Sequence, residues 1–225
     1  MRYPIPPPES ILLLMAFAFP TGFGANISAL VRPKSSRSIA SSLAGLVLTY
    51  GLLIGMAALV APQHVIQFNR PSSPLFYGLG LLGGGLCLLL EYLVGVGLTS
   101  LHSGILVTRL EVHSSYAGSS NLSWQDIAMV MALVIGEEWV LRQMLVSLSL
   151  TGFGLTPGVV IALCAAFYAL NHITFGPQTV LAKLASGLVY TILFFASGFA
   201  ILVPILGHAA QNLALLLLTR SGGQR

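Results

Sequence analysis

Seven apolar stretches dominate this sequence, and each is about long enough to cross a lipid bilayer as a helix. A spanning helix needs about 20 mostly apolar residues. Only 7% of the 225 residues are charged and 56% are hydrophobic, whereas a soluble domain carries about 25% charged residues. We therefore expect an all-α fold, a polytopic membrane bundle of about seven transmembrane helices. The expected spans are residues 10–31, 39–62, 75–101, 124–150, 156–175, 178–197 and 199–219.

The spans divide the chain into three parts. Residues 1–123 hold the first three helices and their loops, residues 124–219 hold the last four, and residues 220–225 form a short polar tail. Membrane lipid is the expected surrounding. The basic residues lie mostly in short connectors, a pattern that orients membrane proteins and does not indicate nucleic-acid binding. Six basic residues are expected on one side of the membrane and two on the other, which favours a cytoplasmic C-terminus and an external N-terminus. The six are Arg32, Lys34, Arg37, Arg109, Arg220 and Arg225, and the two are Arg2 and Arg70.

Glycine and proline positions predict how the spans pack and bend. Two glycine pairs have the four-residue spacing that lets helices approach closely in lipid. These pairs are Gly51 with Gly55 and Gly80 with Gly84. Pro20 and Pro204 lie inside expected spans, where a missing amide hydrogen bond usually bends a helix.

The stretch GEEWVLRQML, residues 136–145, places three ionisable side chains inside an expected span. Facing lipid, they would cost on the order of 8–10 kcal/mol together, at about 2.5–3.5 kcal/mol each. They must therefore face inward. Glu138 and Arg142 are four residues apart, about 40° around the helix axis, so they can pair on one face. Glu137 lies about 100° from Glu138 and therefore needs a polar partner from another helix.

Two further spans carry polar side chains at the same four-residue interval. Tyr168 and His172 share one face of span 156–175, in the stretch FYALNHITFG. His208 and Asn212 share one face of span 199–219, in the stretch PILGHAAQN. Three helices thus direct polar side chains inward, which predicts an intramembrane polar cavity between the fourth, fifth and seventh spans.

These residue types suit hydrolysis, by either of two schemes. A glutamate with a histidine can hold and deprotonate water, while a second histidine with an asparagine can donate hydrogen bonds to an oxyanion. Alternatively, Glu137, His172 and His208 form a set of two histidines and one carboxylate that can bind catalytic zinc. No cofactor is certain from the sequence, and one divalent zinc ion stays an open alternative.

The three segments resemble the signature of the CAAX-protease and bacteriocin-processing (CPBP, or Abi) family of intramembrane proteases. That signature is EExxxR, then FxxxH, then HxxxN, on separate transmembrane helices. Glu137, Glu138 and Arg142 match the first motif, and His208 and Asn212 match the third. The second motif departs, because Tyr168 occupies the phenylalanine position before His172. The resemblance covers about residues 124–219 and leaves the first three spans unassigned.

The resemblance implies a role for each motif residue. Glu137 would be the general base on the attacking water, assisted by His172. His208 and Asn212 would stabilise the oxyanion of the tetrahedral intermediate. Glu138 with Arg142 would hold the shape of the site or contact the substrate. The resemblance leaves metal dependence open, so the enzyme would be of the glutamic type or a metalloendopeptidase.

Other polar residues near the motifs carry less information. Tyr168 and Asn171 are candidates for binding the substrate, although structural packing is the favoured interpretation of both. Glu91 lies in span 75–101, outside the motifs, and a helix-end or packing role is favoured.

Two other classes of protein could also carry buried polar residues of this kind. A proton-coupled transporter also uses buried carboxylates and histidines, but it often shows repeated halves, and this sequence shows no internal repeat. A catalytically inactive immunity or scaffold relative predicts eroded motif positions, whereas these are filled. We therefore expect an intramembrane endopeptidase of a prokaryotic plasma membrane, acting on a peptide cut near the membrane interface. The substrate would be a CAAX-like tail, a propeptide or a C-terminal sorting anchor.

Overall fold

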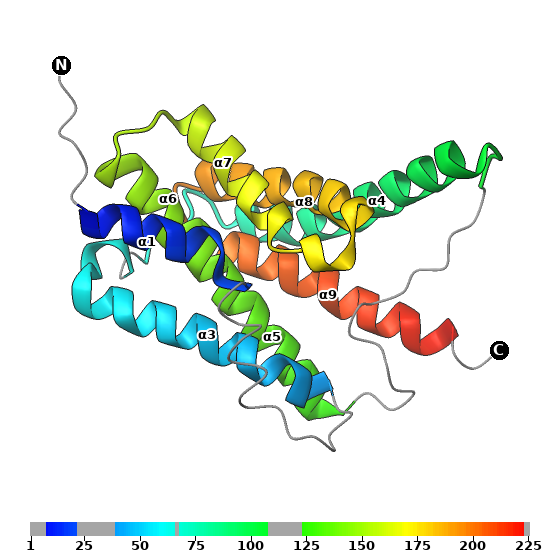
Figure 1. Ribbon diagram of the computed structural model, residues 1–225, viewed down its shortest axis with the longest axis horizontal. Coiled ribbons are helices and arrows are strands. Elements are labelled where there is room, and N and C mark those ends of the chain that lie inside the picture. Colours follow the sequence, from blue (N-terminus) through cyan, green and yellow to red (C-terminus); the bar gives the residue numbers. More distant parts are fainter. Residues whose placement is uncertain (1–7, 22–38, 66–67, 108–122, 223–225) are drawn as a thin grey trace.

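The computed structural model describes residues 8–21, 39–65, 68–107 and 123–222. Within these ranges all regular secondary structure is helical and no strand occurs, which confirms the all-α prediction. The main helices, shown in Figure 1, are α1 (Pro8–Ala18), α3 (Ile39–Val60), α4 (Leu75–Ser103), α5 (Trp124–Glu138), α6 (Leu145–Ser147), α7 (Pro157–Leu170), α8 (Pro177–Ala196) and α9 (Leu202–Gly222). Short 3₁₀ turns cover Pro62–His64 and Ile173–Phe175.

One long helical stretch runs over residues 124–152. It consists of α5, the π-helical segment Trp139–Met144, α6 and a second π-helical segment, Leu148–Gly152. Ser123 begins the stretch with a capping box, in which its hydroxyl accepts from the amide of Asp126 and the Asp126 carboxylate accepts from the Ser123 amide. Such reciprocal bonds satisfy amide groups that have no partner in a first helical turn.

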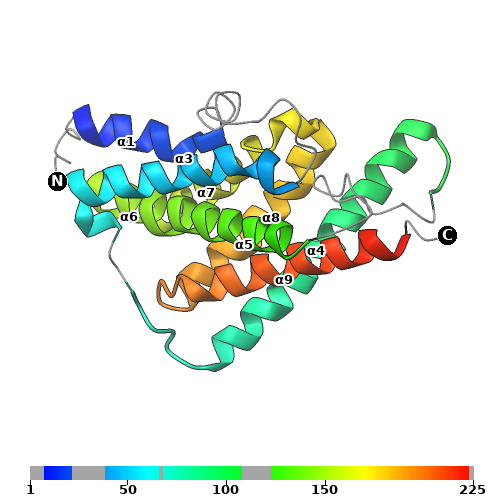
Figure 2. The same cartoon turned by 90° about the horizontal axis from the view of Figure 1, so that it is seen from below.

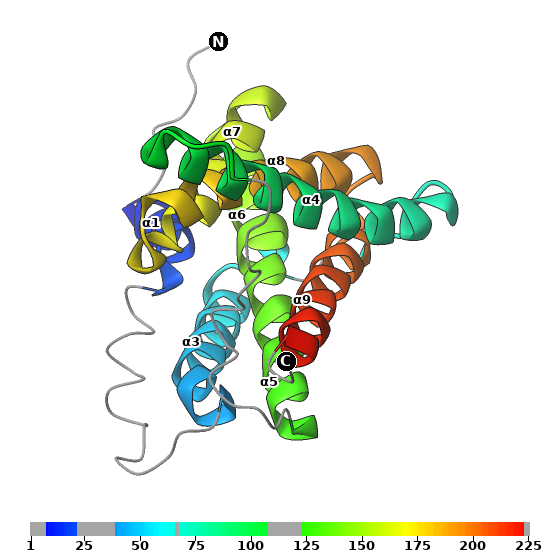
Figure 3. The same ribbon diagram turned by 90° about the vertical axis from the view of Figure 1, so that its right-hand side faces the viewer.

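The helices pack around this long stretch. α3 and α9 both contact α5, which lies between them in Figure 3. α4 packs against α8 and α9, and α7 packs against α8. Figure 2 shows α4 crossing α9 at a steep angle and extending past it at both ends. α4, which belongs to the N-terminal part of the chain, therefore packs directly against the last two helices, α8 and α9.

In the part of the chain that the structure describes, three helices are long and apolar enough to cross a membrane: Leu43–Val60, Leu75–Ser103 and Pro177–Ala196. Pro157–Leu170 and Leu202–Leu218 are shorter apolar helices. These findings support an integral membrane protein, while the count of seven spans stays a prediction. In the first expected span, α1 covers only 11 residues, and residues 22–31 lie outside the described ranges.

Glycines allow α4 and α9 to approach closely. A methyl group on Gly84 would clash with the backbone carbonyl of Gly207, and one on Gly80 would clash with the carbonyl of Val203. This contact confirms the packing role predicted for the Gly80 and Gly84 pair. The prediction for the other pair is wrong within the described residues, because nothing lies within 4 Å of a side chain built at Gly51 or Gly55.

Pro204 lies at a helix boundary, so the bend expected within its span is wrong, whereas the bend expected at Pro20 stays a prediction because residues 22–31 lie outside the described ranges. Pro204 is the third residue of α9, and a proline is tolerated in a first turn because that amide has no helical partner. At Pro20 the helical structure resumes after an interruption at Phe19, beyond the end of α1 at Ala18. The turn between α8 and α9 contains Gly198 and Phe199 with positive φ angles of 76° and 63°.

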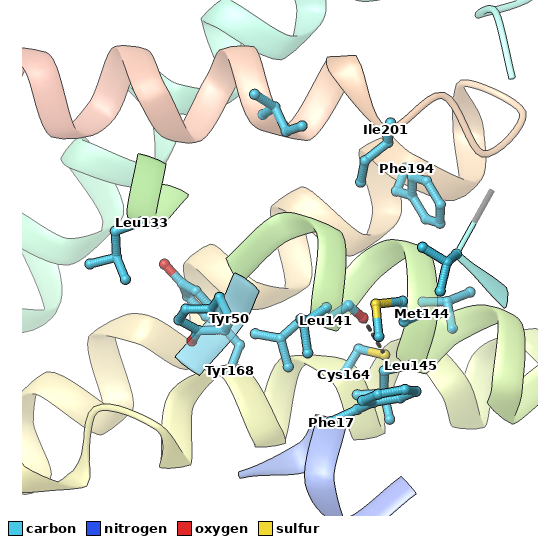
Figure 4. Close-up of a cluster of buried hydrophobic side chains, with 14 of the residues drawn as sticks. Phe17, Tyr50, Leu133, Leu141, Met144, Leu145, Cys164, Tyr168, Phe194 and Ile201 are labelled. Atoms are coloured by element: carbon cyan, nitrogen blue, oxygen red, sulfur yellow. Dashed lines mark hydrogen bonds between the residues drawn. The ribbon is translucent and has the colours of Figure 1, made fainter. Parts of the chain in front are cut away.

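The apolar core joins α1, the long helical stretch and α7. Figure 4 shows Phe17, Leu145 and Cys164 close together, with the thiol of Cys164 donating to the carbonyl oxygen of Leu141 at 3.6 Å. Tyr168 of α7 belongs to the same core. The site residues on α5 and α7 therefore stand on tightly packed helices.

Candidate active site

The acidic motif lies where the long helix changes its hydrogen-bonding pattern. Glu137 and Glu138 are the last residues of α5, and Arg142 lies in the π-helical segment Trp139–Met144. π-Helical turns are rare and are often found at functional sites. This local widening of the helix occurs at the three ionisable side chains.

Glu138 connects two helices through one carboxylate oxygen. Its Oε1 accepts from Nη1 of Arg142 at 3.1 Å and lies 2.8 Å from Nδ1 of His208 on α9. The side chains of Glu138 and Arg142 have no exposed surface. The predicted pairing on one helix face is thus present, and it also includes a histidine from another helix.

Glu137 lies beside the other nitrogen of the same imidazole. Its Oε2 is 3.8 Å from Nε2 of His208. The two glutamates therefore flank one imidazole ring, with Glu138 at Nδ1 and Glu137 at Nε2. Among the described residues, no hydrogen bond or ion pair joins Glu137 to His172, so the neighbour of the expected base is His208.

Tyr168 brings the two histidines of the motifs together. Its backbone carbonyl accepts from Nδ1 of His172 at 2.9 Å, and its hydroxyl lies 3.3 Å from Nε2 of His208. A carbonyl can only accept, so Nδ1 of His172 carries a proton and Nε2 is the nitrogen left to act as a base or ligand in the neutral ring. The ring centroids of Tyr168 and His172 are 5.0 Å apart.

Aromatic rings enclose the charged cluster. The guanidinium carbon of Arg142 lies 4.5 Å from the ring centroid of Tyr168 and 5.8 Å from that of Tyr190 on α8. Tyr190 also stacks on His208, with centroids 5.3 Å apart and planes inclined by 23°. Its hydroxyl donates to Oε1 of Gln211. A cation held against aromatic faces away from water is stabilised by the ring quadrupole.

The side chain of Asn171 forms hydrogen bonds with the residues at the C-terminal end of α1. Its Oδ1 accepts from the amide and the hydroxyl of Thr21, at 3.2 and 2.6 Å. Its Nδ2 donates to the carbonyls of Ala18 and Phe167, each at 2.8 Å. These four bonds favour the structural interpretation of Asn171, and its role in substrate binding stays a prediction.

Asn212 lies one turn after His208 on α9 and is partly buried. Among the described residues, its side chain makes no hydrogen bond, which leaves the amide available to another molecule. The preceding residue, Gln211, is the one that is almost fully buried and bonded to Tyr190. The expected role of Asn212 in binding an oxyanion stays a prediction.

A second, partly buried polar cluster was not recognised from the sequence. Glu91 on α4 accepts from Nζ of Lys183 at 2.8 Å and from the hydroxyl of Ser186 at 2.7 Å. On α8, Lys183, Ser186 and Tyr190 follow at intervals of three and four residues, the spacing of one helix face. This stripe of polar side chains along an apolar helix is the sequence signal from which the cluster could have been predicted. Glu91 thus joins α4 to α8, in agreement with its expected packing role.

The proposed zinc ligands do not fit a metal ion in this arrangement. Within the described parts of the chain, no group of three or more His, Cys, Asp or Glu side chains is placed so that it could hold one. Nδ1 of His208 is directed at Glu138, and no hydrogen bond or ion pair joins Glu137 to His172 among the described residues. We therefore derive no chemical step through a metal.

Comparison with known families adds an independent result. Residues 119–214 match the family described as Type II CAAX prenyl endopeptidase Rce1-like, a stretch of less than half of the chain. Neither the curated proteins nor the solved structures gave a match. The matched residues contain all three motifs, and at this level the match indicates a CAAX-type protease. Residues 119–214 are thus similar to the type II CAAX prenyl endopeptidase family and are called the Rce1-like segment below.

Proposed function

We propose that the protein is an intramembrane endopeptidase that hydrolyses a peptide bond near the membrane interface with water activated by Glu137. The observation that carries the proposal is the 3.8 Å separation between Oε2 of Glu137 and Nε2 of His208. These groups come from helices about 70 residues apart in sequence, and Glu137 is 7% exposed. A buried carboxylate beside a polar nitrogen, inside an apolar bundle, is suited to holding a water molecule.

The proposed reaction begins when Glu137 takes a proton from water. The water oxygen attacks the carbonyl carbon of the scissile bond, and negative charge develops on the carbonyl oxygen. His208 and Asn212 donate hydrogen bonds to that oxygen. Preorganised donors of this kind lower the barrier because they need little rearrangement as charge appears.

The remaining motif residues position these groups. Glu138 bonds Nδ1 of His208 and so directs Nε2 toward Glu137. Arg142 balances the charge of Glu138. His172, whose Nε2 is left free by its bond to Tyr168, assists with proton transfer. Tyr168 and Asn171 remain candidates for contact with the substrate.

The proposed substrate is a peptide with a membrane-proximal cleavage site. A CAAX-like tail, a propeptide and a C-terminal sorting anchor all fit this description. In a prokaryotic plasma membrane, which we propose as the location, maturation or sorting of secreted peptides ranks first among them. The enzyme is proposed to work by the metal-free scheme, and a metal assay on purified protein with and without chelator tests this point.

The test compares membrane peptides from cells that hold wild-type or Glu137→Gln protein. The amide cannot accept the proton from water, so the variant should fold normally and accumulate an uncut precursor. The same protein level and the same peptide profile in both cells would contradict the proposal and favour an inactive relative. Thermal unfolding of both proteins in detergent controls for loss of structure.

A further inference from the structure

Tyr168 contacts three motif residues at the centre of the candidate active site. Its hydroxyl lies 3.3 Å from Nε2 of His208, its carbonyl accepts from His172, and its ring lies against Arg142. The side chain is completely buried, so the hydroxyl cannot bond to bulk solvent. A buried tyrosine hydroxyl normally has a hydrogen-bond partner, and here the partner is the imidazole expected at the oxyanion.

The hydroxyl is also the point at which this sequence departs from the FxxxH motif. A phenylalanine at position 168 would keep the ring beside Arg142 and His172, and the backbone carbonyl would still accept from His172. Packing therefore explains the aromatic ring but leaves the hydroxyl without a purpose. The extra oxygen lies 3.3 Å from Nε2 of His208, the nitrogen that is proposed to donate to the oxyanion.

We propose that the hydroxyl of Tyr168 is a catalytic hydrogen-bond donor that stabilises the oxyanion together with His208. This inference rests on the proposed function. The hydroxyl and Glu137 both flank Nε2 of His208, at 3.3 and 3.8 Å. Groups that flank one nitrogen can act on adjacent atoms of one substrate, the carbonyl oxygen and the attacking water.

The step balances in atoms and charge. The water oxygen bonds to the carbonyl carbon, its proton passes to Glu137, and the π electron pair moves onto the carbonyl oxygen. Nε2–H of His208 and O–H of Tyr168 both donate to that oxygen. When the carbon–nitrogen bond breaks, the electron pair returns to form the carbonyl, and the proton on Glu137 passes to the leaving nitrogen.

The substitution Tyr168→Phe tests the proposal because it removes a single oxygen and keeps the ring. The substrate is the precursor that accumulates in Glu137→Gln membranes, synthesised and presented to purified enzyme in detergent micelles. We expect kcat to fall on the order of 10²-fold, the usual effect of removing one oxyanion donor, with KM unchanged. The unfolding temperature should fall by no more than about 4 °C, the effect of one ordinary hydrogen bond.

The matched control is Tyr92→Phe, which removes a hydroxyl from α4 outside the site and should leave kcat, KM and stability unchanged. A Tyr168→Phe enzyme with wild-type kcat overturns the inference while the proposed function stands. A rise in KM alone overturns it too, as does loss of the folded state, because these results assign the hydroxyl to binding or to structure. If no precursor accumulates in Glu137→Gln membranes, the proposed function fails first and the inference fails with it.

Discussion

Arg142 is a single residue whose surroundings define its role. Its guanidinium bonds Glu138 and lies against Tyr168 and Tyr190, and no part of its side chain is exposed. Its Nε and Nη2 atoms, like Oε2 of Glu138, are buried without a hydrogen-bond partner among the described residues. The site therefore contains polar atoms that can form hydrogen bonds with another molecule, in addition to those within the protein.

Replacing Arg142 should destabilise the protein. In Arg142→Ala, the buried carboxylate of Glu138 would lose its cationic partner, and breaking a buried ion pair in this way costs about 3–5 kcal/mol. We expect a lower unfolding temperature in detergent and a loss of cleavage. Arg70→Ala, which changes an exposed arginine, serves as the control. An unchanged unfolding temperature for Arg142→Ala would show that the pair contributes nothing to stability.

At this scale, spacing along the chain predicted only contacts within one helix. The pair of Glu138 and Arg142 followed from their interval of four residues. The bond from His208 to Glu138, and the approach of Glu137 to His208 rather than to His172, depend on how α5, α7 and α9 cross. No periodicity within one helix contains that information.

At the scale of elements, the contact between α4 and α9 depends on glycine. Gly84→Ala should destabilise the protein by at least about 1–3 kcal/mol, the usual cost of overpacking, because the new methyl group meets the rigid backbone of Gly207. The matched control is Gly85→Ala on the same helix, where nothing lies within 4 Å. Unfolding in detergent compares the two variants. Equal stabilities would contradict the close contact.

A second contact between elements ties the turn after α3 to the long helix. Nδ1 of His64 lies 2.9 Å from the hydroxyl of Ser147, and Nε1 of Trp139 donates to the carbonyl of Val65 at 3.2 Å. Burial lowers the pKa of His64 from its ordinary value of 6.5. As pH falls, His64 therefore binds a proton at a higher pH in the unfolded chain than in the folded protein. The stability linked to His64 is complete above about pH 6.5 and is lost as pH falls through the lowered pKa.

The substitution His64→Gln measures this linkage. Between about pH 7.5 and about pH 5.5, the unfolding temperature of wild-type protein should fall more steeply than that of the variant. His102→Gln, at an exposed position near the end of α4, should behave like the wild type. Equal slopes for wild type and His64→Gln would show that His64 does not contribute.

Helix existence was predictable from apolar length, whereas helix ends were not. Pro204 lies in an apolar run, and only the structure shows that α9 begins two residues earlier. Asn171 lies next to a motif histidine, yet its bonds reach Ala18 and Thr21 some 150 residues away. Contacts of such long sequence separation leave no local pattern.

For the whole molecule, the packing of α4 gives the N-terminal part a structural role. α4 contacts α8 and α9, and its Glu91 is bonded to Lys183 and Ser186. The helices before residue 124 therefore support the Rce1-like segment. The division of the chain at residue 123 stays a prediction, as does the number of spans.

The central claim is that residues from separate helices hold a water molecule that cuts a peptide bond. Purified wild-type protein and Glu137→Gln, each in lipid vesicles, would be given the accumulated precursor in water enriched in oxygen-18. The account predicts that wild-type protein forms a product whose new carboxyl group contains one heavy oxygen, and that the variant forms none. Equal rates of product formation by the two proteins would contradict it.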